Sequence, residues 1–449
     1  TGVHYPVNSR TPVSAGRNDC LYPPPMSQEI PGRIGILRPL RLRDFALLWT
    51  GMAISMIGDG VYFVAIAWQV YEISNRPSAL ALVGVAWSLP QVLLMLLSGA
   101  LADRFNRRRL MIAGDLIRCA AIATIGTLSI TGRLTVPLVI GLVVVYGVGQ
   151  AIFQPSFSAI VPTIVPGDLL VEANSLAQFV RPFSMMLLGP LIGGLLIAAF
   201  GAGWAFVFDG GTFAFSALMI LLMRTRPEPR DADSGERLMS EVAEGLRYVI
   251  AHRWLILAMV GATVSLLATW GPWETLVPYV IKNELHGGPT ALGLVFGAGG
   301  LGSVAAALFF GQRGRLPRRP VTALYLAWAI AMFGTAGFGL VTGVWEAMIV
   351  ALATEACITI LVVIWFTLVQ RLVPNDLLGR VTSLDWMISI GGVPLSFAIV
   401  GPVASTIGAR MTLVLAGILG GGLTLAVMFL PGARDPERDG SLDTPVAAS

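Results

Sequence analysis

Charged residues are scarce in this chain: they make up 12% of its 449 residues, against about 25% in ordinary soluble domains. Lysine occurs once, at Lys282, and Asn283 follows it, so a Walker A loop ending in Lys-Ser or Lys-Thr is absent. The three histidines form no His-Glu-x-x-His motif, and the three cysteines suggest no disulfide framework. These absences exclude an ATP-driven pump acting by itself and give no support for a metal centre or an enzyme.

Apolar residues are abundant instead. They supply 55% of the chain, and the mean hydropathy is +0.75. A soluble core cannot absorb this much apolar surface, which excludes a water-soluble enzyme. A membrane-spanning helix needs about 20 apolar residues, so twelve spans need roughly 240 to 300 residues. The chain is long enough for twelve, with room for tails and one longer loop.

Breaks at arginine, proline and glycine divide the apolar runs into twelve candidate spans. The separation of the fifth span from the sixth rests on the short Gly201-Ala202-Gly203 segment. The fold class is therefore an all-α polytopic membrane protein with twelve transmembrane helices. The predicted spans are 45–71, 79–102, 110–130, 136–160, 173–200, 204–223, 254–281, 290–312, 320–341, 345–370, 381–407 and 411–430.

The distribution of basic residues predicts how the spans are oriented. An even number of spans places both termini on one side of the membrane. Most of the 30 lysine and arginine residues share that side; those on the opposite side are Arg76, Arg133, Lys282 and Arg410. Since cytoplasmic loops carry the excess of positive charge, both termini are expected in the cytoplasm. The near-absence of lysine beside many arginines indicates a GC-rich bacterial genome, so we expect a multi-pass protein of the bacterial inner membrane.

Three segments lie outside the spans. Residues 1–44 are rich in proline and hold no apolar run, which predicts a disordered cytoplasmic tail. The first residue is Thr1, and Met26 is an alternative start. Residues 224–253 form the longest internal loop, and the apolar spacing within it predicts an amphipathic helix on the inner membrane surface. Residues 431–449 are a polar cytoplasmic tail.

The sequence contains an internal repeat with an offset of 208 residues. The segment Val165-Pro-Gly-Asp-Leu-Leu170 recurs as Val373-Pro-Asn-Asp-Leu-Leu378, and Ser175-Leu176 recurs as Ser383-Leu384. The repeat divides the membrane domain into two six-span halves, 45–223 and 254–430. Parallel halves of this kind are typical of transporters in which the substrate path lies between them.

A motif between the second and third spans carries a resemblance to a known family. It reads Gly99-Ala-Leu-Ala-Asp103-Arg104-Phe-Asn-Arg107-Arg108-Arg109, and it resembles the G-x-x-x-D-R-x-x-R-R signature of the major facilitator superfamily. The segment Asn375-Asp-Leu-Leu-Gly379-Arg380 resembles the branch that holds macrolide and siderophore exporters. The resemblance covers roughly residues 38–430 and implies secondary transport by alternating access.

The resemblance assigns conformational roles to several of these residues. In the family, the loop around Asp103 and Arg104 packs against the start of span eleven, where a carboxylate at a helix N-terminus gains about 0.3–1 kcal/mol. Because that contact forms in one conformation only, it biases the switch between states. A plain topological anchor is the alternative. Asp115 and Arg118, three residues apart on span three, either extend this charge network or form a structural pair.

A glycine motif in span five resembles the family's antiporter signature, G-P-x-x-G-G. It consists of Gly189, Pro190, Gly193 and Gly194. The alternative is close helix packing through a GxxxG face, and the two interpretations are compatible. The pattern Gly297-Ala-Gly299-Gly-Leu-Gly302 matches a dinucleotide-binding motif in form, but it lies inside span eight without a preceding strand. It is interpreted as helix packing.

Ionisable residues inside spans are the strongest candidates for function, because charge at membrane depth is costly unless it is paired or hydrated. The resemblance implies that spans one, four, seven and ten line the cavity. Spans one, seven and ten each carry an acid, and span four carries two glutamines instead. Span five holds the one deep cation, Arg181, which we expect to partner Asp59 or Glu355. Asp209 and Asp385 lie nearer span ends and are assigned structural roles. The candidates for proton coupling or substrate binding are Asp59, Glu355, Glu274, Arg181, Gln150 and Gln154.

The sequence thus predicts a proton-driven exporter of amphipathic organic compounds, drug-like or siderophore-like. A proton-coupled importer of a polar nutrient and a non-transporting membrane sensor are the alternatives. The expected partners are a small-molecule substrate, protons and membrane lipid, with no nucleic acid, cofactor or metal, and the working unit is expected to be a monomer.

Overall fold

The computed structural model describes residues 35–104, 106–224, 235–313 and 316–438. At 35–36, 95–104, 159, 168, 171, 175, 235–242 and 375–376 it describes the backbone alone. The side chains of Gly99, Asp103 and Arg104, and the tail residues 1–34 and 439–449, therefore lie outside what is described below.

Every regular element in the described ranges is a helix. The first elements are η1 Gly35–Arg41, α1 Arg43–Ile73, α2 Pro77–Arg104, α3 Arg107–Ile130, α4 Val136–Ile164, η2 Gly167–Leu169, α5 Leu170–Val180, η3 Arg181–Leu188, α6 Gly189–Phe200 and α7 Ala202–Leu221. The others are α8 Gly235–Ala251, α9 Arg253–Tyr279, η4 Val280–Glu284, α10 Pro289–Arg313, α11 Pro320–Leu340, α12 Val344–Leu372, α13 Asn375–Gly391, α14 Val393–Ile407, α15 Ala409–Phe429 and α16 Asp435–Arg438.

Among the described residues, twelve helices or continuous helix runs are long and apolar enough to cross a membrane, which confirms the predicted twelve spans. The fifth run joins α5, η3 and α6, the seventh joins α9 and η4, and the eleventh joins α13 and α14. The predicted break between the fifth and sixth spans is present at Gly201. This residue has φ +87°, a left-handed conformation that favours glycine, and Gly408 with φ +85° makes the corresponding turn between the last two spans.

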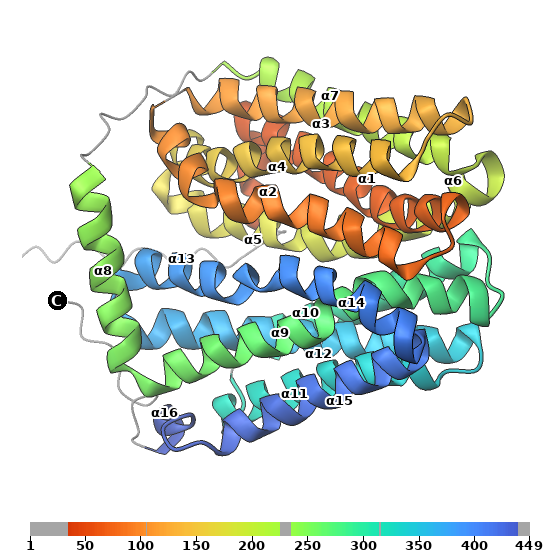
Figure 1. The fold of residues 1–449 in the computed structure, drawn as a ribbon. Helices are drawn as coiled ribbons and strands as arrows, with labels where there is room; N and C mark the ends of the chain where they lie inside the picture. The colour runs from red at the N-terminus through yellow and green to blue at the C-terminus, as the bar shows by residue number, and fades with distance from the viewer. Residues whose placement is uncertain (1–34, 105, 225–234, 314–315, 439–449) are drawn as a thin grey trace, which may run out of the picture. The chain divides into compact units, whose positions relative to one another are not determined.

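The helices pack as two groups, the N-terminal helices α1–α7 and the C-terminal helices α9–α15 (Figure 1). Within the first group α3 packs on α4 and α7, and α1 packs on α7. Within the second, α10 packs on α12, and α11 on α15. The main contacts between the groups join α6 and η3 to α10, and α2 to α14.

The two ends of the helix bundle differ. One end, here called the turn end, holds the short connections 74–76, 131–135, 201, 285–288, 341–343 and 408. The opposite end, here called the α8 end, carries α8 and α16 (Figure 1). There α8 packs on α13. Gly245 lies against the Arg380 side chain, and Arg380 forms an ion pair with Glu244 in which Nη1 and Oε2 are 2.5 Å apart.

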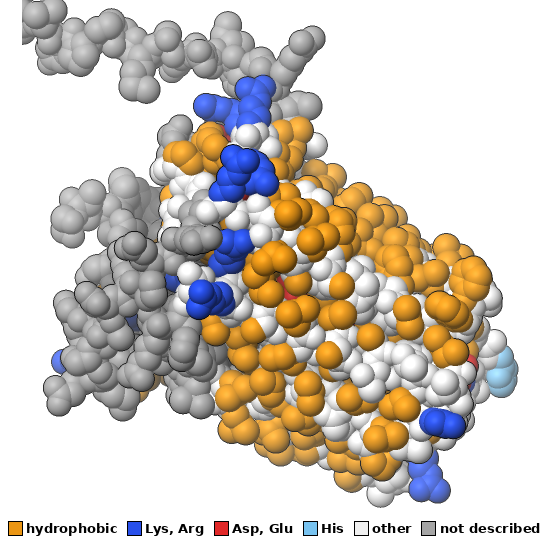
Figure 2. All heavy atoms as spheres, turned by 90° about the horizontal axis from the view of Figure 1, so that it is seen from above, with side chains coloured by type: hydrophobic (Ala, Val, Ile, Leu, Met, Phe, Trp, Pro, Cys, Tyr) orange, Lys and Arg blue, Asp and Glu red, His pale blue; other side chains and the backbone are white. Residues whose placement is uncertain are grey.

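The outer surface is largely apolar. Figure 2 shows one face on which hydrophobic side chains are widespread, while lysine and arginine side chains gather near its edges. Large apolar residues that are exposed include Leu93 at 64%, Phe200 at 67% and Leu340 at 69%. Such a surface suits a lipid environment, because helices satisfy their backbone hydrogen bonds internally and can present apolar side chains outward.

We expect Gly189→Ala to destabilise the protein. A Cβ at Gly189 would lie 2.6 Å from the Cα of Gly60, so backbone on α1 or α6 must move. Overpacking of this kind costs about 1–3 kcal/mol. The measurement is thermal unfolding in detergent, with Gly211→Ala as the matched control, because a Cβ at Gly211 meets nothing within 4 Å. Equal unfolding temperatures for the two variants would show that the close approach is not needed.

Candidate functional site

Asp59 lies near the middle of α1, half-buried and flanked by Gly58 and Gly60. The Tyr146 hydroxyl of α4 donates a 2.8 Å hydrogen bond to its Oδ1. The Tyr146 ring stacks on Tyr62 with centroids 4.9 Å apart, which holds the phenol in place. The hydrogen-bond partner of Asp59 is therefore a tyrosine on span four, which the sequence did not single out.

Arg118 on α3 is 1% exposed and lies in a closed cage. Its Nη2 forms an ion pair with Asp115, and its Nη1 donates a 2.7 Å hydrogen bond to Gln150. The rings of Phe153 and Phe213 face the guanidinium at 4.4 and 4.3 Å. The sequence allowed either a structural pair or an extended network for Asp115 and Arg118, and the pair is present together with contacts from α4 and α7.

Asp209 is wholly buried on α7 and lies against α1 at Gly58. A Cβ at Gly58 would collide with the Asp209 carboxyl, so the glycine makes room for the acid. Asp59, Asp115 and Asp209 lie on three helices; Asp115 pairs with Arg118, and the charge of Arg118 also acts on Asp59 and Asp209. We call these three acids and Arg118 the acid cluster. The sequence analysis assigned Asp209 a structural role because it lies near a span end, and only the fold places it here.

Arg181 begins the π-helical segment η3, and its side chain is exposed. It makes no ion pair within the described part of the chain, although the charges of Asp59 and Glu355 both act on it. Arg181 therefore lies between an acid of the N-terminal helices and an acid of the C-terminal helices. A π-helical segment widens a helix locally and is frequent at functional sites.

The other predicted acids of the C-terminal helices lie apart from the cluster. The stem of Glu355 on α12 packs against Gly299 of α10, and the Ser303 hydroxyl donates to the Glu355 backbone carbonyl at 3.4 Å. Glu274 on α9 adjoins Trp273, and its charge reaches Tyr62 of α1. Gln150 is engaged by Arg118, whereas Gln154 has an exposed side chain.

The glycine motif of the fifth span lies at the closest helix contacts. Gly189 and Gly193 face α1, where a Cβ on Gly193 would lie 3.1 Å from the Val61 Cα. Gly194 faces α10, where its Cβ would lie 3.0 Å from the Cα of Gly293, and Pro190 presents its carbonyl to Gly293. The Gly297–Gly302 pattern lies at helix contacts too, as its interpretation as packing requires: Gly297 meets Leu191 and Gly302 meets the Leu352 carbonyl.

At the turn end the two helix groups are joined by polar and aromatic contacts. The Tyr71 hydroxyl donates to the Thr275 carbonyl at 2.6 Å, and its ring meets that of Tyr279 with centroids 5.5 Å apart. Asn75 Nδ2 donates to Asn283 Oδ1 at 2.7 Å. Tyr71 and Tyr279, like Asn75 and Asn283, differ by the 208 residues of the internal repeat. We call these four residues the turn-end latch. The repeat offset is the sequence signal that would have found it.

The basic motif has three described arginines near the α8 end, Arg107, Arg108 and Arg109. Arg108 donates from Nε to the Ile220 carbonyl at 3.0 Å and from Nη2 to the Leu221 carbonyl at 2.6 Å. It thereby caps the last carbonyls of α7. Arg107 begins α3, and the Arg109 backbone N–H donates to Asn106 Oδ1 at 3.3 Å. In the second half Arg380 pairs with Glu244 of α8, and a Cβ at Gly379 would meet open space.

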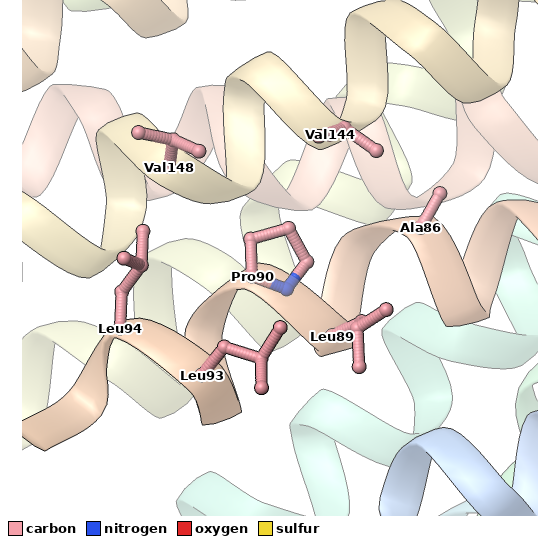
Figure 3. Close-up of a pocket in the computed structure, with 7 residues that line it drawn as sticks. All are labelled: Ala86, Leu89, Pro90, Leu93, Leu94, Val144 and Val148. Carbon is pink, nitrogen blue, oxygen red and sulfur yellow. The ribbon is translucent and has the colours of Figure 1, made fainter.

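An apolar groove lies between α2 and α4 (Figure 3). It encloses about 290 Å³ and contains none of the charged candidates. Its lining residues are Ala86, Leu89, Pro90, Leu93, Leu94, Val144 and Val148.

Comparisons with known proteins cover nearly the whole chain. The sequence profile of the transmembrane secretion effector family matches residues 34–444. Multidrug efflux pump Tap of Mycolicibacterium fortuitum is 28% identical over 417 residues, covering 88% of this chain and 97% of Tap. Macrolide efflux protein A of Streptococcus pyogenes is 21% identical over 383 residues, covering 84% and 93%.

Two solved structures show the same fold. A bacterial homolog of the human lysosomal transporter Spinster, inward-facing and unoccupied, has a TM-score of 0.63 at 15% identity, covering 92% of this chain and 100% of that one. A bacterial homologue of the iron transporter ferroportin, also inward-facing, has a TM-score of 0.63 at 16% identity, covering 87% and 99%.

We expect Arg118→Gln to destabilise the protein strongly. Removing one partner of a buried ion pair costs about 3–5 kcal/mol, because the other charge stays buried and unpaired. Asp115→Asn in the same chain removes that charge, so the double variant should be more stable than the sum of the two single effects predicts. Thermal unfolding of the four proteins gives the coupling energy. Simple additivity would mean that the pair does not act as a unit.

Proposed function

This chain belongs to the transmembrane secretion effector family of the major facilitator superfamily, and from that premise we propose that it exports amphipathic organic compounds in exchange for protons. Membership makes it a multi-pass membrane transporter of small molecules and not an enzyme. The names of its relatives, a multidrug pump and a macrolide efflux protein, support drug-like substrates. Siderophore-like compounds share the same amphipathic character and fall within the proposal.

The observation that carries the proton-antiport proposal is the position of Asp59. It lies near the middle of a spanning helix, it is partly accessible, and it accepts a hydrogen bond from Tyr146. The charges of Arg118 and Arg181 act on it from two sides. A carboxylate at this depth needs a proton, a cation or a hydrogen-bond donor to offset its charge. A proton and a cationic group of the substrate would compete for the same acid, which is sufficient to couple their movements.

The remaining span residues have supporting roles in this proposal. Arg181, on which the charges of Asp59 and Glu355 both act, would balance one acid or the other as the halves move. Glu274 adjoins Trp273, and this aromatic residue with Phe63 and Phe296 offers an apolar surface near the turn end. Gln150 and Gln154 supply polar contacts from α4.

The turn end is proposed to face the outside and the α8 end the cytoplasm. The positive-inside distribution supports this orientation, and it places both termini in the cytoplasm. In this orientation the closed turn-end latch seals the outer side, so we propose that the conformation is inward-facing. The gating roles of Gly99, Asp103 and Arg104 remain proposals, as does the role of the Gly189–Gly194 motif. Since one chain holds both halves, a monomer is a sufficient transport unit in the bacterial plasma membrane.

We expect Asp59→Asn to abolish export against a gradient while preserving folding. The amide has nearly the shape of the acid and still accepts from Tyr146, but it releases no proton. Exchange of substrate between two equal pools needs no net proton movement and should survive better. Both modes would be measured in proteoliposomes with an imposed pH gradient.

The matched control is Asp385→Asn. Asp385 accepts a 2.8 Å hydrogen bond from the Trp365 indole nitrogen, and an amide oxygen can keep that role. Uphill export by Asp59→Asn at the normal rate would make Asp59 structural and leave Glu355 as the leading proton carrier.

We expect Asn75→Cys with Asn283→Cys to lock the transporter. In a background with Cys20, Cys119 and Cys357 replaced by serine, an oxidant or a short crosslinker should join the two positions. Export should stop and return on reduction, because alternating access requires the turn end to open. Asn75→Cys alone is the control. Normal export by the crosslinked protein would show that the latch stays closed throughout transport.

A further inference from the structure

We infer that Asp209 is a second proton-binding site of this transporter, coupled to Asp59 because both share the guanidinium of Arg118. The inference rests on the proposed proton antiport and extends it to an enclosed residue. Asp59 faces the accessible region, whereas Asp209 lies behind it on α7 with no exposed surface. The acid cluster would then hold a proton away from both sides of the membrane.

Asp209 lacks the partners that an ionised carboxylate requires. Its Oδ2 is buried without a hydrogen bond in the described part of the chain. Its Oδ1 meets the Thr212 hydroxyl at 3.3 Å, but that hydroxyl also donates to the Asp209 backbone carbonyl at the shorter distance of 2.7 Å. Burying an unpaired charge costs several kcal/mol, so the carboxyl is neutral here and carries a proton.

Arg118 is the cation whose charge acts on Asp209, and both of its terminal nitrogens are engaged, although its Nε has no partner in the described part of the chain. Arg118 binds Asp115 through one terminal nitrogen and Gln150 through the other. The titratable or charged groups that face Asp209 come from α1, α3 and α4, while α6 contributes none. They are Asp59, Tyr62, Arg118, Cys119 and Tyr146. Three carboxyl groups therefore share one guanidinium. Arg118 alone balances one of the three negative charges, so the other two need a proton or another cation, and Arg181 acts on Asp59 but is not among the charges that act on Asp209.

The contact between α1 and α7 couples Asp209 to Asp59. Gly58 lets the Asp209 carboxyl lie directly against α1, one residue before Asp59. The charge of Asp59 acts on Asp209, and two carboxylates repel each other, so a proton on Asp59 favours ionisation of Asp209, and the reverse also holds. The step is a simple transfer: an O–H bond breaks on Asp209 and one forms on Asp59. The net charge of the cluster does not change, and Arg118 stabilises the carboxylate left behind.

Infrared spectroscopy of the purified full-length protein tests the proton on Asp209 without any substrate. The carbonyl stretch of a protonated carboxyl is separated from the amide bands, and pH-step difference spectra isolate it. We expect a band at neutral pH that Asp209→Asn loses and Asp385→Asn retains. In Asp59→Asn the same band should titrate at a pH displaced by about one unit or more, a change of about 1.4 kcal/mol.

Two outcomes would overturn the inference. An unchanged spectrum in Asp209→Asn would show that Asp209 holds no proton, and an unshifted titration in Asp59→Asn would show that the two acids are independent. If Asp209→Asn does not fold, Asp209→Ser provides a second neutral variant with a smaller side chain.

Proton counting connects the site to transport. Tetraphenylphosphonium, a lipophilic cation, is added to weakly buffered protein, and the protons released per bound cation are measured. Asp209→Asn should release fewer protons than the unsubstituted protein, while Asp385→Asn should release the same number. If the unsubstituted protein and both variants release the same number of protons, Asp209 does not take part in the transport cycle. If the unsubstituted protein releases no protons on binding, the proton-antiport proposal itself fails, whereas the infrared titration still decides whether Asp209 binds a proton.

Discussion

A single guanidinium, that of Arg118, acts on carboxyl groups from three helices, and two of these acids, Asp115 and Asp209, are closed to solvent. Its contacts run to α4 through Gln150 and Phe153 and to α7 through Phe213, so the N-terminal helices are joined at this point. An arginine serves here better than a lysine, because its planar group pairs with an acid and stacks between aromatic rings simultaneously. The electrostatics of the N-terminal helices therefore depend on which of the three carboxylates is neutralised by the one positive charge of Arg118.

The C-terminal helices contain no comparable cluster within the described residues. Their polar contacts include an uncharged pair, Ser265 with Thr424, an acid bound to a neutral donor at Asp385, and ion pairs of Arg380 and Arg410 with acids of α8 and η4. The three acids that share one guanidinium thus all belong to one side of the path between the groups. Glycine contacts such as Gly194 with Gly293 bring the two sides together without any side chain to obstruct sliding.

Much of this architecture was predictable because its causes are local. Apolar runs predict the twelve spans, and the Gly201 break predicts the turn before α7. The surroundings of the charges were not predictable, since they come from helices far apart in sequence. Spacing pairs Asp115 with Arg118, but nothing local places Asp209 behind Gly58. Arg181 was expected to partner Asp59 or Glu355 directly; it acts on both by charge, while a hydrogen bond to Asp59 comes from Tyr146.

The turn-end latch joins positions that the repeat makes equivalent, tyrosine to tyrosine and asparagine to asparagine. A self-complementary contact of this kind is what two identical subunits make across a two-fold axis. In a six-span ancestor that worked as a dimer, one substitution would have altered both partners together. Fusion into one chain released that constraint, so each partner now varies independently. The surviving symmetric pairs are the positions at which the present transporter still resembles an assembly of two molecules.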